Sequence, residues 1–403
     1  MKKVTFIADF GSNYRTGGGA TFSRGFLKIL KKLPIELTVI FIWCPEIDGQ
    51  NPWRDSNMYM IPISKNIFGK VRGEISFAFK ANRIIKNLPQ QDLFIFDTPG
   101  ITVRFMPKHV PICAMAHGSE YAHWSDFSFI HLRSTLRRFL WKNLFINPIQ
   151  KDLLLLKSGI PLFNSKHTLR RLAEDFKVSE ELLKEFVTYL PVDVEACSRN
   201  YDARKRIRER YNIKNDEVVI AVISNFADYK RPELLPPITR KVLEKVSMSH
   251  VRFFFVGKKN TSSASLEAFI ESSASHGRCI RLFEVSPMEV RDIYSAADIA
   301  LSTSISETFG YFVAEGMSAS LPFVAYGNSG GVSELIKHNS TGFLVESEDE
   351  FISRLVLLIN NKKLREQMGA RSFSRIKNIF SAEAFKKRFI NILNSRLKFD
   401  IQP

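Results

Sequence analysis

The sequence of 403 residues contains few cysteines and no hydrophobic run long enough to cross a membrane. Its four cysteines lie far apart and lack the close pairing that is typical of disulfide frameworks and zinc sites, so we expect reduced thiols and no bound zinc. No stretch of 18 apolar residues occurs, and the apolar run after Met1 reaches Asp9 too soon for a secretory signal. The sequence therefore predicts a cytoplasmic protein without a signal peptide or a membrane span.

Acidic residues are scarce relative to basic ones. The chain has 41 Asp and Glu against 58 Lys and Arg, which gives a formal net charge of +17. A charge of this size predicts attraction to an anionic partner, for which nucleic acid, anionic lipid and a phosphorylated substrate are candidates. A surface charge that serves only solubility is the alternative.

The pattern of hydrophobic residues predicts two α/β domains. Short β-rich runs alternate with helical stretches, as in a parallel, doubly wound sheet, and the length exceeds that of one ordinary core. After residues 190–193 the alternation pauses in the strongly basic segment 204–210 and then restarts, which places the domain boundary near residues 190 to 200. We predict a first domain over residues 1–195, a second over 196–378, and in 379–403 a terminal amphipathic helix that packs back towards the first domain. The expected strands are 4–8, 37–43, 93–96, 112–115 and 162–164, then 218–223, 251–256, 279–282, 299–301 and 323–325.

Two carboxylates stand eight residues apart at a junction between an expected strand and an expected helix. Glu307 falls on the connecting loop, and Glu315 falls about one turn into the helix that starts near Tyr311. Each carboxylate can accept two hydrogen bonds from a vicinal diol, and the helix N-terminus suits an anionic oxygen. This spacing predicts a cleft that binds sugar hydroxyls beside a phosphate.

Two other segments could contact phosphate. Gly17, Gly18 and Gly19 precede the first expected helix, where their amides can approach an oxyanion closely, although a merely tight connection is the alternative. Lys230 and Arg231 follow the first strand of the second domain and could place two cations over a diphosphate. A solvated pair of loop cations is the other interpretation of these two residues.

His117 follows the expected strand 112–115, at the edge where parallel sheets bind ligands. A structural histidine is the competing interpretation. Ser128 to Lys157 is rich in arginine, lysine and aromatic residues and contains a single acid, Asp152. Such an amphipathic helix is suited to the surface of an anionic membrane, whereas packing in the domain core is the alternative.

Together these motifs resemble the retaining glycosyltransferases of family 4, whose Glu-x7-Glu motif matches Glu307 to Glu315. The resemblance covers roughly residues 215 to 346, where 294–298, 319–325, 330–334 and 341–345 stand in the family's order and spacing. In the first half it is limited to 17–20, 117–118, 164–165 and 190–193. The resemblance implies a GT-B fold of two facing Rossmann-like domains.

The resemblance also implies how the sugar part of a nucleotide-sugar donor is held. Glu315 would bind the ribose hydroxyls. Glu307, together with Thr308 and the amides of Phe309 and Gly310, would bind the donor hexose.

The remaining donor contacts follow from the same resemblance. Lys230 would bind the diphosphate, and the glycine turn would approach its distal phosphate. Asn225 stands where many family members carry an arginine, so Arg231 would supply part of the missing charge. Val285 lies in the segment that would face the nucleobase.

The implied chemistry breaks the bond between the anomeric carbon and the diphosphate, with His117, Glu307 and Lys230 as the catalytic set. Cations and helix amides would stabilise the leaving group. The chain contains no Asp-x-Asp, so no metal or other cofactor is needed to explain this step. Because no carboxylate nucleophile is evident, retention favours same-face attack, in which the departing phosphate takes the acceptor's proton.

The leading hypothesis is therefore a retaining hexosyltransferase. It would use a nucleotide-sugar donor and a lipid-linked glycan acceptor, in bacterial envelope polysaccharide synthesis at the inner face of the membrane, and it would bind no nucleic acid. One alternative is a catalytically inactive GT-B protein that binds anionic lipid or nucleic acid. Another is a sugar-nucleotide epimerase on the same fold, because a fold alone does not determine a function.

Overall fold

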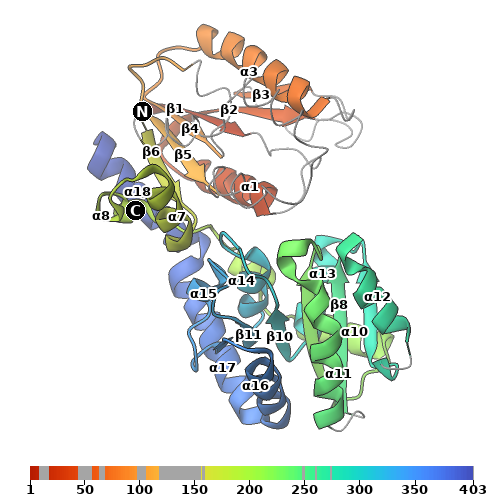
Figure 1. Cartoon of the computed structure of the whole chain (residues 1–403). Helices are drawn as coiled ribbons and strands as arrows, with labels where there is room; N and C mark the ends of the chain where they lie inside the picture. Colours follow the sequence, from red (N-terminus) through yellow and green to blue (C-terminus); the bar gives the residue numbers. More distant parts are fainter. Residues whose placement is uncertain are drawn as a thin grey trace. The chain divides into compact units, whose positions relative to one another are not determined.

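The computed structural model describes most of the chain and divides it into two compact units. The first unit comprises Met1–Pro191 and Phe385–Pro403, and the second comprises Val192–Ala384. In each unit the strands form a central layer that is flanked by helices (Figure 1). The described residues are 1–8, 18–43, 57–62, 69–97, 106–117, 156, 159–246, 250–258, 261–272 and 275–402.

The first unit contains a parallel sheet of six strands in the order β3-β2-β1-β4-β5-β6. The order reverses between β1 and β4, so the chain winds outward from this point in both directions. The elements are β1 (Lys2–Ala8), α1 (Gly18–Leu30), β2 (Ile35–Trp43), β3 (Met58–Pro62), α3 (Gly69–Asn87), β4 (Leu93–Phe96), β5 (Ile112–Ala116), β6 (Gly159–Phe163), α7 (Lys166–Phe176) and α8 (Glu180–Leu183).

The second unit repeats this plan with the strand order β12-β11-β10-β7-β8-β9, again all parallel. Its strands are β7 (Val218–Ser224), β8 (Val251–Gly257), β9 (Cys279–Phe283), β10 (Ile299–Ser302), β11 (Phe323–Tyr326) and β12 (Gly342–Val345). Its helices include α9 (Val194–Cys197), α10 (Tyr201–Arg210), α11 (Leu235–Lys245), α12 (Ala264–Glu271), α13 (Pro287–Ala296), α14 (Tyr311–Ser318), α15 (Val332–Leu335), α16 (Glu348–Asn360) and α17 (Lys362–Arg375).

The two sheets confirm the predicted fold class, two doubly wound parallel α/β layers. The residues of β10 and β11 are all buried, as expected for central parallel strands that are covered on both faces. Helix ends also coincide with capping signals in the sequence. Helix α13, for example, starts with Pro287, and Ser286 and Glu289 form a capping box at its N-terminus.

The last helix, α18 (Ala382–Leu397), starts in the second unit and contributes its residues from Phe385 onward to the first. Phe385 and Phe389 pack edge-on against Phe26 of α1, with ring centroids 5.2 and 5.0 Å apart. Such aromatic contacts add specific geometry to the burial of apolar area.

The basic segment 204–210 belongs to helix α10. Arg204 and Arg208 both bind the carboxylate of Asp298, at 2.7 and 3.3 Å, and both donate to the carbonyl oxygen of Ala296. Arg208 is only 5% exposed. These two cations therefore serve the fold at the start of β10, and the net charge of +17 overstates the cationic surface that is open to a partner.

Candidate functional site

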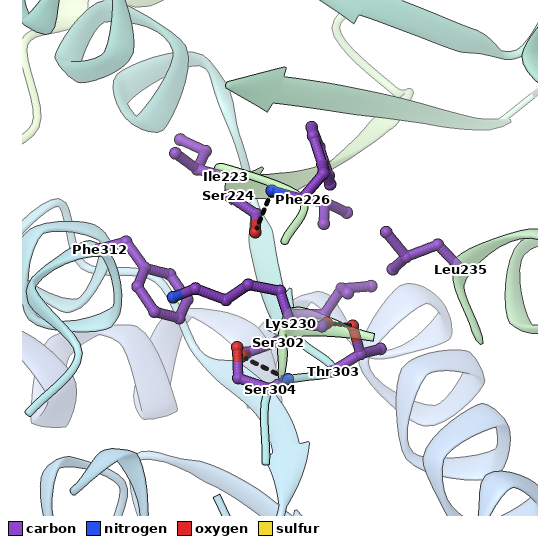
Figure 2. A pocket seen from close by; sticks show the side chains of 11 residues that line it. Ile223, Ser224, Phe226, Lys230, Leu235, Ser302, Thr303, Ser304 and Phe312 are labelled. Carbon is purple, nitrogen blue, oxygen red and sulfur yellow. Dashed lines mark hydrogen bonds between the residues drawn. The ribbon is translucent and has the colours of Figure 1, made fainter. Parts of the chain in front are cut away.

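The strand order of the second unit reverses between β7 and β10. In sheets of this type, ligands bind outside the carboxyl ends of the strands at such a point. A pocket lies there, and Figure 2 shows its lining side chains around Lys230. The lining residues are Val222, Ile223, Ser224, Phe226, Lys230, Leu235, Leu301, Ser302, Thr303, Ser304 and Phe312.

Lys230 is the cation of this pocket and is only 8% exposed. It ends the short 3₁₀-helix Asp228–Lys230, and its carbonyl oxygen accepts a hydrogen bond of 2.6 Å from the hydroxyl of Thr303. Its side chain reaches Phe312, whose ring centroid lies 4.4 Å from the ammonium nitrogen (Figure 2). The ammonium forms an ion pair with Glu307. Lys230 is therefore fixed at both its backbone and its side chain.

The loop that carries Lys230 has two residues in the left-handed backbone region. Phe226 and Arg231 both have a φ of 48°. Non-glycine residues in this region cost about 1 to 3 kcal/mol each and cluster at functional sites. Phe226 is held there because its ring is fully buried and packs against Phe283, with ring centroids 5.8 Å apart. Packing in the core thus holds the loop in this conformation.

Arg231 lies beside Lys230 in the chain but does not line the pocket. Its Nε donates to the carbonyl oxygen of Thr303 at 2.7 Å, and its guanidinium stands 4.3 Å from the ring centroid of Tyr326. Burial lowers the pKa of Arg231. Asn225, whose side chain accepts a hydrogen bond from the amide of Ala227, does not line the pocket either. Of the predicted diphosphate residues on this loop, only Lys230 reaches the pocket in this structure.

The segment from Glu307 to Gly310 is held against the loop that follows β11. The amide of Gly331 donates to the carbonyl oxygen of Glu307 at 2.6 Å, and the amide of Glu307 donates to that of Ser329 at 3.3 Å. A Cβ on Gly331 would stand 2.4 Å from the carbonyl oxygen of Thr308, so only glycine permits this contact. The glycine pair at 330–331 therefore positions the loop that carries Glu307.

Gly310 joins this loop to helix α14. Its φ of 95° is in the left-handed region, and it occupies the N-cap of the helix. Phe309, which is 3% exposed, anchors the loop next to Tyr311, with ring centroids 5.3 Å apart. Thr308 and the amides of Phe309 and Gly310 thus lie at the start of the helix, as the sequence pattern predicts.

Glu315 has different surroundings from Glu307. It lies in the second turn of α14, half-buried, and Arg291, Tyr294 and Tyr311 are close enough to interact electrostatically with it. Burial raises the pKa of Glu315 to about 7, and the charge of Arg291 opposes that rise. The carboxylate of Glu307 is paired with the ammonium of Lys230. The carboxyl group of Glu315 is instead kept partly protonated near neutral pH by burial.

Replacing Glu315 with glutamine is expected to remove a pH-dependent loss of stability. Because the pKa of Glu315 is raised from 4.5 to about 7 in the folded protein, the folded state binds more protons than the unfolded state between these values. The free energy of unfolding should therefore fall as pH rises from 5 to 8, by up to about 3 kcal/mol from this group. Urea titrations at several pH values should show this fall in the wild type, whereas the variant should lack it. Parallel pH profiles would contradict the assignment.

The first unit presents its own polar residues at the corresponding edge. His117 follows β5, and its Nε2 donates to the carbonyl oxygen of Asp97 at 2.9 Å. Burial lowers the pKa of His117 to about 4, so the imidazole is neutral at pH 7. Since Nε2 carries the proton, Nδ1 is a hydrogen-bond acceptor.

Asp97 and Ser23 are two residues that the sequence analysis missed. Asp97 follows β4, at the reversal of strand order, and its carboxylate accepts a hydrogen bond of 2.5 Å from Ser23 on α1. Both side chains are buried. A polar residue directly after a buried strand is the signal that identified His117, and it could also have identified Asp97.

The other predicted residues are placed as follows. Gly18 and Gly19 are the first residues of α1, whereas Gly17 lies outside the described residues. Val285 follows β9, is partly buried and comes directly after Glu284, whose amide donates to the carbonyl oxygen of Gly257 at 2.9 Å. The segment Ser128 to Lys157, predicted to contact a membrane, also lies outside the described residues, apart from Leu156.

Metal-binding clusters and membrane-spanning helices are absent from the described part of the chain. There, no three His, Cys, Asp or Glu side chains form a group that could hold a metal ion. Within the same residues, no helix has both the length and the apolar character needed to span a membrane.

The second unit is similar in sequence to known proteins. Residues 203–375 match the family described as glycosyl transferases group 1. Trehalose synthase from Pyrococcus horikoshii is 26% identical over 230 residues, which cover 54% of this chain and 55% of that protein. An uncharacterized glycosyltransferase from Haemophilus influenzae is 22% identical over 377 residues, covering 92% and 94% of the two chains. The chain thus spans about half the length of the first curated relatives that it matches.

The fold has counterparts among solved structures. The Anabaena protein Alr3699/HepE, solved in complex with UDP and glucose, is 15% identical and superposes with a TM-score of 0.69 over 98% of this chain and 100% of that one. At this identity the likeness shows the fold alone. The chain therefore has the GT-B fold, and its residues 203–375 are similar to the group 1 glycosyl transferases.

Proposed function

We propose that this protein is a retaining glycosyltransferase that moves a hexose from a nucleotide-diphosphate sugar to a glycan acceptor. The observation that carries the proposal is the position of Lys230, a nearly buried cation at the strand-order reversal of the second sheet, paired with Glu307 ahead of the helix that carries Glu315. The cation is suited to the diphosphate of a sugar diphosphate, and the carboxylate is suited to its sugar hydroxyls.

In this proposal the second unit binds the donor. Lys230 contacts the diphosphate, Glu307 and the amides at the start of α14 contact the hexose, and Glu315 accepts hydrogen bonds from the ribose. Support comes from the HepE structure, whose ligands are UDP and glucose, and from the family match over residues 203–375. Val285 and its neighbours after β9 are assigned to the base.

The proposed chemistry is a same-face substitution at the anomeric carbon. The bond from that carbon to the diphosphate oxygen breaks, a bond to the acceptor oxygen forms, and the departing diphosphate takes the acceptor's proton. Lys230 and the helix amides stabilise the charge that builds on the leaving oxygen. This step uses no metal. His117, a neutral side chain with an acceptor at Nδ1, is suited to orient a hydroxyl group rather than to transfer a proton at neutral pH.

We further propose that the acceptor belongs to the bacterial envelope and is lipid-linked, which would place the protein at the cytoplasmic face of the membrane. The support is the excess of basic residues, since a positive surface is attracted to anionic headgroups. The first unit would bind this acceptor, and the segment Ser128 to Lys157 would contact the membrane.

The test is a hydrolysis screen of UDP-, GDP-, ADP- and dTDP-sugars without acceptor, with and without EDTA. One nucleotide series is expected to release free sugar slowly, with the anomeric configuration of the donor retained by NMR and with no loss in EDTA. Neither binding nor hydrolysis of any series by the folded protein would contradict the proposal. An epimerised nucleotide sugar as the product would instead identify an epimerase. Salt-sensitive binding to DNA or anionic vesicles without turnover would indicate a binding protein.

A further inference from the structure

Two charged residues of the proposed donor site are paired with each other. The ammonium of Lys230 and the carboxylate of Glu307 form an ion pair whose side chains are 9% and 12% exposed. The ring centroids of Phe312 and Tyr229 lie 4.4 and 5.0 Å from the ammonium nitrogen. The two groups assigned to the diphosphate and to the hexose therefore bind each other.

This pairing limits which ligands can enter. A buried charge that loses its partner is strongly destabilised unless another group replaces that partner. Phosphate oxygens can replace Glu307 at Lys230, but they leave the Glu307 carboxylate without its cation. Sugar hydroxyls can replace Lys230 at Glu307, but they leave the ammonium without its anion. A ligand that carries only one of the two parts pays the cost of breaking the pair without restoring both partners.

We propose, on the basis of the function proposed above, that the Lys230–Glu307 pair makes the site selective for ligands in which a diphosphate is joined to a hydroxylated sugar. The joined ligand replaces both partners at once, with phosphate oxygens at Lys230 and hydroxyls at Glu307. The bare nucleoside diphosphate satisfies only Lys230. After transfer the pair re-forms and displaces the nucleoside diphosphate, so the same contact limits product inhibition.

Glu307→Gln tests this proposal, because it keeps the shape of the side chain and removes its charge. Calorimetry should measure the affinity of wild type and variant for the nucleotide sugar found in the donor screen, for its nucleoside diphosphate and for inorganic pyrophosphate. With Lys230 freed, the affinity for the diphosphate and for pyrophosphate is expected to rise about tenfold, since a charge-assisted contact is gained without breaking a pair. The affinity for the nucleotide sugar should fall, because the amide is a weaker acceptor for hydroxyls.

Two further variants separate this effect from general electrostatics and from misfolding. Glu366→Gln makes the same chemical change on the exposed Lys362–Glu366 pair of α17 and should alter pyrophosphate affinity by less than about threefold. Phe312→Leu keeps both charges but removes the ring that holds the ammonium, so it should raise diphosphate affinity modestly even if Glu307→Gln does not fold.

The outcomes distinguish the two proposals. If wild type binds a nucleotide sugar and neither Glu307→Gln nor Phe312→Leu gains affinity for the diphosphate, the selectivity proposal is wrong and the proposed function stands. An equal gain in Glu366→Gln would also overturn it, because net charge would then explain the effect. If wild type binds no nucleotide sugar, the proposed function fails and this inference fails with it.

Discussion

Replacing Lys230 with methionine is expected to lower kcat/KM for sugar transfer by about a thousandfold. Methionine preserves most of the apolar stem beside Phe312 but removes the cation that would face the leaving diphosphate. Loss of a single preorganised group that stabilises developing negative charge costs about a hundredfold to a thousandfold in rate. The measurement is steady-state transfer, or donor hydrolysis if no acceptor is known.

The same substitution should also destabilise the protein, because it leaves the carboxylate of Glu307 without its partner. Removing one member of a buried pair costs about 3 to 5 kcal/mol, and water at the partly exposed edge should lower that figure here. The double variant Lys230→Met/Glu307→Gln should recover much of the stability while activity stays low.

Lys245→Met provides the matched control, since Lys245 is exposed in the last turn of α11. It should leave both rate and stability unchanged. A rate for Lys230→Met within about tenfold of wild type would remove this lysine from the catalytic set. A contact between a phosphate oxygen and a charged ammonium should change the rate by more than tenfold.

Gly310→Ala is expected to destabilise the second unit by about 3 kcal/mol and to reduce activity with it. Two effects add at this position. Alanine is strained at a φ of 95°, and its Cβ would stand 2.5 Å from Cγ2 of Val332, a fully buried side chain. To relieve the clash, the loop would shift the amides of Phe309 and Gly310 away from their place at the start of α14. Chemical denaturation measures the loss of stability, and transfer or hydrolysis measures the loss of activity.

Gly277→Ala is the control that separates strain from collision. Gly277 has a φ of 64°, and no heavy atom lies within 4 Å of the position that a Cβ would take, so its replacement should cost only about 1 kcal/mol. A Gly310→Ala/Val332→Ala double variant should be less destabilised than the sum of its parts, because the colliding methyl group is gone. Equal costs at the two glycines would show that the contact with Val332 does not constrain the loop.

The sequence predicted elements best where the signal is local. Buried apolar runs fix β7, β8, β10 and β11, and Ser286 with Pro287 fixes the start of α13. The segment 204–210 was different, because the pattern shows only a strongly basic pause there, whereas the segment forms part of helix α10. The partner of its arginines, Asp298, is some 90 residues away in the chain, so a local pattern cannot reveal the pairing.

The candidate site shows the same division between features that a local sequence pattern reveals and contacts between distant segments that it does not reveal. Its residue types and order, from Lys230 through Glu307 to Glu315, are visible in the sequence because loops at the carboxyl ends of parallel strands converge. The direction of each side chain is not visible. Arg231 adjoins Lys230 but turns towards Tyr326, since its backbone is left-handed and the carbonyl oxygen of Thr303 binds its Nε.

The sequence by itself determined the two parallel sheets and the residues that gather at the edge of the second one. Periodicity and strand-end position, both local properties, are sufficient for that. Only the tertiary structure decided that Lys230 and Glu307 are partners in a nearly buried pair while Glu315 sits apart with a raised pKa. Pairing and burial depend on which surfaces meet across β7, β10 and β11, and these surfaces come from segments far apart in the chain.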